Sequence, residues 1–466
     1  MVVEQYTYLF TLILLLAIFL KIWMDTLVHP SFWGTVENTD MNKSFFFIFF
    51  FCVFVINSFA QTGKSAGLDS LIAEALRNNP RILAAREESA ASYTRIRQNT
   101  SFEPPQAGIE FYQTPLKSFP NPIKNGQETD YSIQQMFPFP GKRAAMGDAA
   151  RNSAVMAERN IGALERQVIH EVKSAYYALY LADRSLSINS RIQELLRELI
   201  AVASRQYEVG SGRQSDILKA QTELSMLSLS TIHLQREKKV AEARVNTLAG
   251  RSPSMSIAPV EDIEKTFPAL MIEQIDSLAL EKRPELQAMD YNIRMRKAEL
   301  AVSRKERMPD FMVRLMYKDM TMSGSDYWST MFGFTIPESF WSKGKVRSKI
   351  EEGSINIRKA QAEFGNMKNE VFLQVHEAYE NVEANRKSIN YYRNSLIPQA
   401  EQTLLAVTDG YRAGTGDFMA VIDAARMLLQ IRKDCETAVS DYMESQASLE
   451  QAVGLDSEKI SNMIHQ

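Results

Sequence analysis

Cysteine is nearly absent from this sequence of 466 residues, which holds only Cys52 and Cys435. Cys52 lies in an N-terminal segment that we expect to be removed, so the mature chain keeps one thiol and an internal disulfide is excluded. Cys52 follows a run of phenylalanines and lacks the small residues of a lipoprotein cleavage site, so no lipid anchor is expected there. The fold must be held together without covalent cross-links.

Patterns typical of enzymes are also missing. His170-Glu171 and His376-Glu377 lack the second histidine of a metalloprotease helix, and no histidine has metal-ligand spacing with another histidine, cysteine or acid. A Walker-type phosphate loop is absent. The formal net charge of −3 gives no general reason to expect nucleic acid as a partner. We expect no enzyme activity, no cofactor and no resident metal, so any driving force must come from a partner protein.

Long apolar runs are confined to the first 60 residues. Residues 41–60 have a short basic start, an apolar core and a small residue at Ala60, which is the pattern of a secretory signal peptide. We interpret residues 1–40 as an upstream start chosen too early, although their apolar stretch, 8–20, also fits a membrane anchor. Later runs fall short of the ~20 apolar residues that a membrane-spanning helix needs. Any membrane crossing by the mature chain must therefore use β-strands.

What the sequence does contain is an internal duplication with an offset near 204 residues. Short segments recur in order: Pro105 as Pro309, Gly141-Lys142 as Gly344-Lys345, Val172-Lys-Ser-Ala-Tyr176 as Val375-His-Glu-Ala-Tyr379, and Tyr207-Glu-Val-Gly210-Ser-Gly212 as Tyr411-Arg-Ala-Gly414-Thr-Gly416. The offset is 203 for the second and third pairs and 204 for the others. An ordered series that drifts by a single residue indicates two copies of one unit.

The duplication defines the domain organisation. We expect a first repeat at 61–254, a linker at 255–274, a second repeat at 275–454 and a tail at 455–466. Each repeat is predicted to contain a helix, two strands, a very long helix, a glycine turn and another helix. In the first repeat these elements are 68–100, 106–113, 130–137, 143–205 and 215–248. The long helix of the second repeat is expected at 346–409, interrupted only by Pro398.

The strand-like segments indicate a membrane wall. In residues 311–320 the odd positions from Phe311 to Tyr317 are apolar, whereas the charges of Arg314 and Lys318 lie at even positions. Such alternation over ~10 residues is typical of an outer-membrane barrel, with Trp328 and Phe332 suited to its interfacial girdle. A half-buried soluble strand has the same pattern. Because four strands cannot close a barrel and open edges are not tolerated in lipid, the chain must oligomerise. Two copies give eight strands and three give twelve, and a channel favours three.

Methionine provides the one suggestive chemical signal. Met308, Met312, Met316, Met320 and Met322 share one parity, and Met331 follows in the next segment. If the odd positions face lipid, Met312, Met316 and Met320 form a stripe of thioethers on the lumen side, and thioethers are soft ligands that suit Cu(I). Methionine also fills space flexibly, and we prefer that simpler account. On this account, replacing the stripe with leucine leaves metal tolerance intact.

Together, the repeat, the Tyr-x-x-Gly turns and the Gly-Lys junctions resemble the TolC-like outer-membrane efflux proteins. The resemblance extends from about Leu68 to Gly454, and the segment from Phe137 to Lys142 is similar to the heavy-metal efflux ducts of the CusC and CzcC type. It implies an α+β membrane protein, in which a homotrimer forms a twelve-stranded outer-membrane β-barrel with four strands per chain. A long periplasmic α-helical barrel continues it. Outer-membrane lipid, a periplasmic adaptor and an inner-membrane pump, with an antiporter type favoured, are the implied partners.

The resemblance also implies roles for single residues. It places the turns with Tyr207, Gly210, Gly212, Tyr411, Gly414 and Gly416 at a periplasmic tip that docks the adaptor. Asp216 and Asp423 fall where a gate of acidic side chains is expected, although both also fit solvated positions near a helix start. Relatives of TolC itself have a second acid at the position of Ala420 and an arginine at that of Gly416. This sequence departs from both, which argues against an identical gate.

Three functions remain open from the sequence. The leading one is a passive duct for efflux, with heavy-metal cations favoured over drugs as cargo. A type I protein secretion duct would use the same architecture, and the genes next to this one would distinguish the two by the kind of pump encoded. A periplasmic coiled-coil scaffold without a pore belongs to another class of function. It predicts a soluble protein that forms neither heat-resistant oligomers nor conducting channels.

Overall fold

The computed structural model describes residues 67–112, 114, 116, 128–257, 272–320, 324–456 and 459–460. All of them belong to the second of two units of the chain, which begins at Ser65. The expected upstream segment 1–40, the signal peptide 41–60 and Met322 lie outside the described residues, as do most of the linker 255–274 and of the tail 455–466.

The first repeat contains the predicted elements with one difference. They are α3 (Leu68–Asn78), α4 (Pro80–Thr100), β1 (Gln106–Tyr112), β2 (Glu128–Phe137), α6 (Lys142–Glu208) and α7 (Gln214–Leu248). The single helix expected at 68–100 is wrong, because the helix is interrupted at Asn79, between α3 and α4. A residue before proline is pushed into extended backbone, and Asn79 has φ −65° and ψ 121°. Its side chain accepts a hydrogen bond from the Arg81 N–H at 3.0 Å and caps the new helix.

The second repeat follows the same order. Its elements are α8 (Ile272–Lys282), α9 (Pro284–Lys305), β3 (Phe311–Asp319), β4 (Tyr327–Phe334), α10 (Lys343–Tyr391), the π-turn η2 (Tyr392–Leu396), α11 (Ile397–Arg412) and α12 (Phe418–Val453). The π-turn lies where the repeat offset changes from 203 at Tyr379 to 204 at Tyr411. A π-turn accommodates one extra residue in a helix. It directly precedes Pro398, whose missing N–H weakens the helix at that point.

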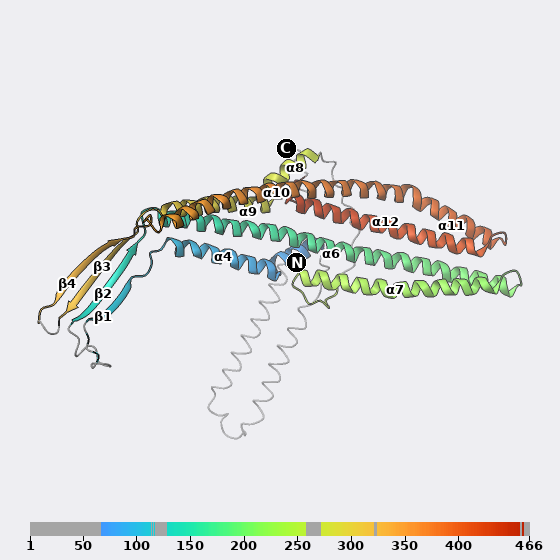
Figure 1. Ribbon diagram of the computed structural model, residues 1–466. Helices are drawn as coiled ribbons and strands as arrows, with labels where there is room; N and C mark the ends of the chain where they lie inside the picture. The colour runs from blue at the N-terminus through green and yellow to red at the C-terminus, as the bar shows by residue number, and fades with distance from the viewer. Residues whose placement is uncertain are drawn as a thin grey trace, which may run out of the picture. The chain divides into compact units, whose positions relative to one another are not determined.

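The four strands form one antiparallel sheet in the order β1-β2-β3-β4. Its central pair joins the two repeats, since β2 and β3 pair from Thr129 opposite Asp319 to Phe137 opposite Phe311. Figure 1 shows the sheet at one end of the long helices and the two glycine turns at the other end. Both edge strands, β1 and β4, have a neighbour on one side only.

The helices pack in a layer with α6 as its central member. Near the turns, Leu196 and Leu199 of α6 belong to one apolar cluster with Phe418 and Val421 of α12. The ion pair between Lys173 and Glu450 ties the same two helices together farther from the turns. Figure 1 shows α4 and α7 along one edge of this layer and α10 along the other. Within the described residues, no helix combines the length and apolar character needed to cross a bilayer.

In each repeat, a hydrogen bond joins the residue between the two short helices to the end of the last helix. The side chain of Asn79 donates from Nδ2 to the carbonyl oxygen of Leu248 at 3.1 Å. In the second repeat, Arg283 donates from Nη1 to the carbonyl oxygen of Ala452 at 3.3 Å. Both acceptors are among the last carbonyls of a helix, which have no partner within the helix itself. The duplication is therefore preserved in three dimensions even where the side chain has changed.

Candidate functional site

One face of the sheet carries charged and polar side chains. Lys318 Nζ lies 2.5 Å from Glu128 Oε1 and 3.0 Å from Asp130 Oδ2. Four residues along β3, Arg314 donates from Nε and Nη2 to Gln134 Oε1 at 2.9 and 2.6 Å. These contacts cross between β2 and β3, so they join the two repeats as well as two strands. The expected grouping of charges on one face is confirmed.

The opposite face of the sheet is apolar and exposed. Ile109, Ile133, Leu315 and Phe332 come from the four different strands and are all exposed. The pairing register places them on the face away from Lys318. Aromatic rings also meet there, because Tyr317 lies with its centroid 5.3 Å from that of Trp328. A continuous apolar surface on a sheet indicates contact with lipid or with another protein.

The methionines lie on the charged face but do not form one site. Met312 touches Gly333, where an added Cβ would lie 2.8 Å from the Met312 Cε, and Met331 pairs with Arg314. Met316 is four residues from Met312, about 13 Å along a strand, with Arg314 between them. Met320 follows the end of β3. Among the described residues, no group of three His, Cys, Asp or Glu side chains could hold a metal ion.

The first strand-to-helix junction contacts the second repeat. Gly141 has φ +83°, a conformation that favours glycine, and α6 begins at the next residue. The Lys142 Nζ lies 2.7 Å from Asp310 Oδ2, and the N–H of Phe139 donates to Asp310 Oδ1 at 2.9 Å. The corresponding Lys345 is exposed at the start of α10, next to Gly344, where an added Cβ would meet nothing within 4 Å.

The two glycine turns at the far end have the same geometry. In the first, Ser211 and Gly212 donate from their backbone N–H groups to the Gln206 carbonyl oxygen at 2.8 and 2.9 Å. In the second, Thr415 and Gly416 do the same to the Gly410 carbonyl oxygen at 3.0 and 2.9 Å. Gly210 and Gly414 both have φ +76°. A side chain at Gly212 or Gly416 would collide with backbone atoms within 3 Å, so both turns require glycine.

Although Tyr207 and Tyr411 are equivalent in sequence, their environments differ. Tyr411 is 5% exposed and its ring centroid lies 5.0 Å from that of Phe418, whereas Tyr207 is 48% exposed. Gln206 donates from Nε2 to the Tyr411 carbonyl oxygen at 3.2 Å and so joins the two turns. Burial, together with the nearby Asp216 carboxylate, raises the pKa of the Tyr411 hydroxyl. The Tyr411 hydroxyl is buried without a hydrogen-bond partner among the described residues.

The two acidic residues near the turns also have different surroundings. Asp216 lies in the first turn of α7, and its Oδ1 accepts from Ser215 Oγ at 3.2 Å. Asp423 is exposed on α12, with its Oδ1 3.7 Å from Arg426 Nη1. The same arginine reaches the buried Glu223 of α7, where Nη2 lies 2.5 Å from Oε2. The Glu223 hydrogen bond and the charges of both acids raise the pKa of Arg426.

Sequence reasoning did not identify Glu223 and Arg426. They form an ion pair between α7 and α12 that links the two repeats near the expected gate. Asp423 and Arg426 are three residues apart on one helix, which is a visible signal of a local pair. Glu223 is in the other repeat, and its equivalent in the second repeat is Met427, so the duplication gives no sign of this link.

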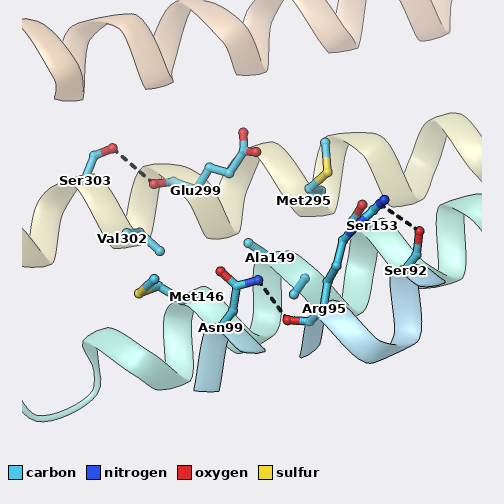
Figure 2. Close-up of a pocket in the computed structure, with 11 residues that line it drawn as sticks. Ser92, Arg95, Asn99, Met146, Ala149, Ser153, Met295, Glu299, Val302 and Ser303 are labelled. Atoms are coloured by element: carbon cyan, nitrogen blue, oxygen red, sulfur yellow. Dashed lines mark hydrogen bonds between the residues drawn. The ribbon is translucent and has the colours of Figure 1, made fainter. Parts of the chain in front are cut away.

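A cavity of about 420 Å³ lies between α4, α6 and α9. Figure 2 shows Asn99 of α4 beside Met146 of α6, Arg95 of α4 extending toward Ser92 and Ser153, and Glu299 of α9 on the other side of the cavity. Arg95 donates from Nη1 to Ser92 Oγ at 3.2 Å, and Asn99 donates to the Arg95 carbonyl oxygen at 2.8 Å. On the other side, Glu299 accepts from Arg296 and Ser303 donates to the Glu299 carbonyl oxygen, so these polar groups of the lining are bonded within their own helices.

Comparison with known protein families finds a match in both repeats. The pattern of the outer membrane efflux proteins matches residues 71–251 and 276–455, one match for each repeat. Together the two matches cover well over half of the chain.

Individual relatives have low sequence identity. The chain is 23% identical over 294 residues to the cobalt-zinc-cadmium resistance protein CzcC of Cupriavidus metallidurans, covering 63% of this chain and 69% of CzcC. It is 20% identical over 309 residues to the alkaline protease secretion protein AprF of Pseudomonas aeruginosa, covering 64% of this chain and 63% of AprF. The solved structure of CusC has a TM-score of 0.72 at 17% identity, covering 85% of this chain and 96% of CusC. At that identity the structural likeness shows the fold alone.

Proposed function

Because the chain belongs to the outer membrane efflux protein family, we propose that it is the outer-membrane exit duct of a tripartite efflux pump. In this role it passively conducts substrates that an inner-membrane pump and a periplasmic adaptor hand over. The duct itself needs neither a catalytic step nor a cofactor. Its place is the outer membrane, with the helices extending into the periplasm.

The observation that carries this proposal is the sheet with two different faces. Its apolar face suits acyl chains, and its charged face, with Lys318 between Glu128 and Asp130, suits a water-filled lumen. An isolated four-stranded sheet would leave the N–H and C=O groups of β1 and β4 unpaired in lipid, at a cost of several kcal/mol each. Closing the sheet with three copies removes both edges and gives twelve strands. The helices that follow the strands then extend the lumen.

We also propose that the glycine turns form the periplasmic tip. The turns with Gly212 and Gly416 lie at the end of the helices away from the sheet. There Asp216 and Asp423 act as gate carboxylates, and the adaptor docks on the turns with Tyr207 and Tyr411. In a ring of three chains these carboxylates repel one another and attract cations. The link between Arg426 and Glu223 holds α12 against α7 in the same region.

Heavy-metal cations are the favoured cargo. The support is the likeness to CzcC, which is named for cobalt, zinc and cadmium resistance. The methionines of the charged face are proposed to fill space in the lumen, since Met312 and Met316 are too far apart for one shared ion. Replacing Met312, Met316 and Met320 with leucine is then expected to leave copper and silver tolerance unchanged. A selective loss of that tolerance would contradict the space-filling role.

The first test is growth of a deletion strain across copper, silver, zinc, cobalt, bile salts and dyes. Sensitivity confined to metals supports metal efflux, whereas sensitivity to bile salts and dyes alone assigns the duct to drug efflux. The purified protein is expected to form single channels in a planar bilayer. Absence of conductance, together with a soluble monomer, would favour a scaffold without a pore.

A second candidate function is protein secretion, because the chain also resembles the alkaline protease secretion protein AprF. The two ducts are distinguished by what fails in the deletion strain. Loss of a protein from the culture medium with normal metal and drug tolerance would assign the chain to secretion. An adjacent gene for an ABC exporter, rather than an antiporter-type pump, would point the same way.

A further inference from the structure

Some helix positions that are equivalent in the two repeats are buried in the second repeat and exposed in the first. Ala288 of α9 is buried and Pro284 is partly buried where α9 packs against α6. Their equivalents at an offset of 204 are Ala84 and Pro80 on α4, and both are exposed. Among the described helices, none takes the position beside α4 that α6 takes beside α9. This side of α4 is therefore open to a neighbouring molecule.

A glycine marks the contact that covers α9. At Gly162 of α6, an added Cβ would lie 3.4 Å from the Pro284 Cβ and 3.5 Å from its Cγ, so the two helices approach closely. The equivalent of Gly162 at an offset of 203 is Gly365 of α10, where an added Cβ meets nothing within 4 Å. The glycine and its proline are thus present in both repeats. Only one pair of them is in contact within the chain.

We propose that Gly365 of α10 packs against Pro80 of α4 in the next copy of this chain, with the geometry that Gly162 and Pro284 have within one chain. The inference rests on the proposed function, because it requires a ring of several copies. The two surfaces lie on opposite edges of the helical layer, so each copy offers one of each and the contact can repeat around a ring.

Charged residues of α7 and α10 support the same alignment of neighbouring copies. Within the chain, Ser440 of α12 donates from Oγ to the Tyr177 carbonyl oxygen of α6 at 3.3 Å. The equivalents of these residues are Arg236 of α7 and Glu380 of α10, and both are exposed in the single chain. The Arg236 side chain is 70% exposed, and its ion pair with the adjacent Glu237 has an N–O distance of 3.5 Å. The proposed contact brings Arg236 of one copy to Glu380 of the next, where their charges are complementary.

Paired cysteines test the contact directly. The Cβ atoms of a disulfide lie about 3.5–4.5 Å apart, so the Gly162–Pro284 spacing is close to that of a natural bridge. Oxidation of the variant P80C/G365C in intact outer membranes is expected to give bands of two and three chain masses on a non-reducing gel. The variant G162C/P284C is the matched control and should lose its two introduced thiols while keeping the mass of one chain. The single variants P80C and G365C report any link to the native Cys435.

If G162C/P284C forms its bridge and P80C/G365C yields only single chains, the proposed register is wrong. The native mass and channel conductance of the parent protein separate this outcome from a failure of the proposed function. A conducting trimer without the cross-link leaves the duct standing and overturns the contact, whereas a monomer overturns both.

Charge reversal tests the contact without cysteines. Arg236→Glu and Glu380→Arg are each expected to lower the fraction of trimer that survives mild detergent by several-fold, and the double variant should restore it. Two single variants that both behave as the parent protein, or losses that the double variant does not restore, would contradict the inference.

Discussion

The ion pair of Lys142 should stabilise the first strand-to-helix junction measurably, whereas the equivalent Lys345 should contribute little to the second junction. Lys142 and Asp310 bond at 2.7 Å with side chains 18% and 23% exposed. Exposed ion pairs contribute about 0–1 kcal/mol, and breaking a fully buried pair costs about 3–5 kcal/mol. For this intermediate burial we expect Lys142→Met to cost about 2 kcal/mol locally. The Phe139 N–H keeps its bond to Asp310 in this variant.

Hydrogen exchange followed by mass spectrometry measures that local cost. If the junction opens locally, 2 kcal/mol corresponds to amide exchange about 30-fold faster in the peptide around Gly141. Lys345→Met is the control, because Lys345 is exposed at the equivalent place. It should change exchange around Gly344 by less than about twofold. Equal effects of the two substitutions, or an unchanged rate in Lys142→Met, would refute the reasoning.

Three further predictions concern the turns and the helices. Gly416→Ala should lower the melting temperature by several degrees, because its Cβ would lie 2.8 Å from a backbone nitrogen; an unchanged melting curve would contradict the need for glycine. Arg426→Ala leaves the buried Glu223 without its ion-pair partner and loosens α12 from α7, so the mean open time of the channel should rise. Adding Glu223→Gln to Arg426→Ala should lengthen the open time little further, and additive effects of the two changes would argue against a shared link. Burial and the Glu436 carboxylate raise the pKa of Tyr180 to about 12, so the stability that its neutral hydroxyl contributes is complete below pH 10 and is lost as the pH rises through about 12. Between pH 10 and 12 the melting temperature of Tyr180→Phe should therefore fall less than that of the parent protein, and equal falls would exclude this role.

Local sequence patterns predicted most elements because their causes are local. Alternation of apolar residues identified the strand at 311–319, and glycines that need positive φ identified the turn with Gly414. The break at Asn79 was missed although its cause, a following proline, is visible in the sequence. The π-turn at 392–396 had a visible counterpart in the sequence, since the offset changes by one residue within the long helix and a π-turn accommodates one extra residue.

The candidate site was harder to predict, because its contacts join residues far apart in the chain. Lys142 was identified as part of a junction, yet its partner Asp310 is in the other repeat. Glu223 and Arg426 were missed because the duplication places Met427 and Thr222 at their equivalent positions. The placement of Met312 and Met316 on the face of Arg314 and Lys318 was predicted, because side-chain direction in a strand has a period of two. The face of Met331 became known only from the pairing of β4 with β3, which sets it opposite Arg314.

The sequence by itself determined that this chain is two copies of one unit, since repeated residues at a nearly constant offset need no structure to be recognised. It also determined which positions of the strand at 311–319 share a face. Only the tertiary structure decided how the copies differ: Tyr411 is buried whereas Tyr207 is exposed, and Gly162 meets a proline whereas Gly365 does not. The physical reason is that α6 has helices of both repeats beside it, whereas α4, α7 and α10 lie at the edges of the layer. Identical residues therefore meet different neighbours.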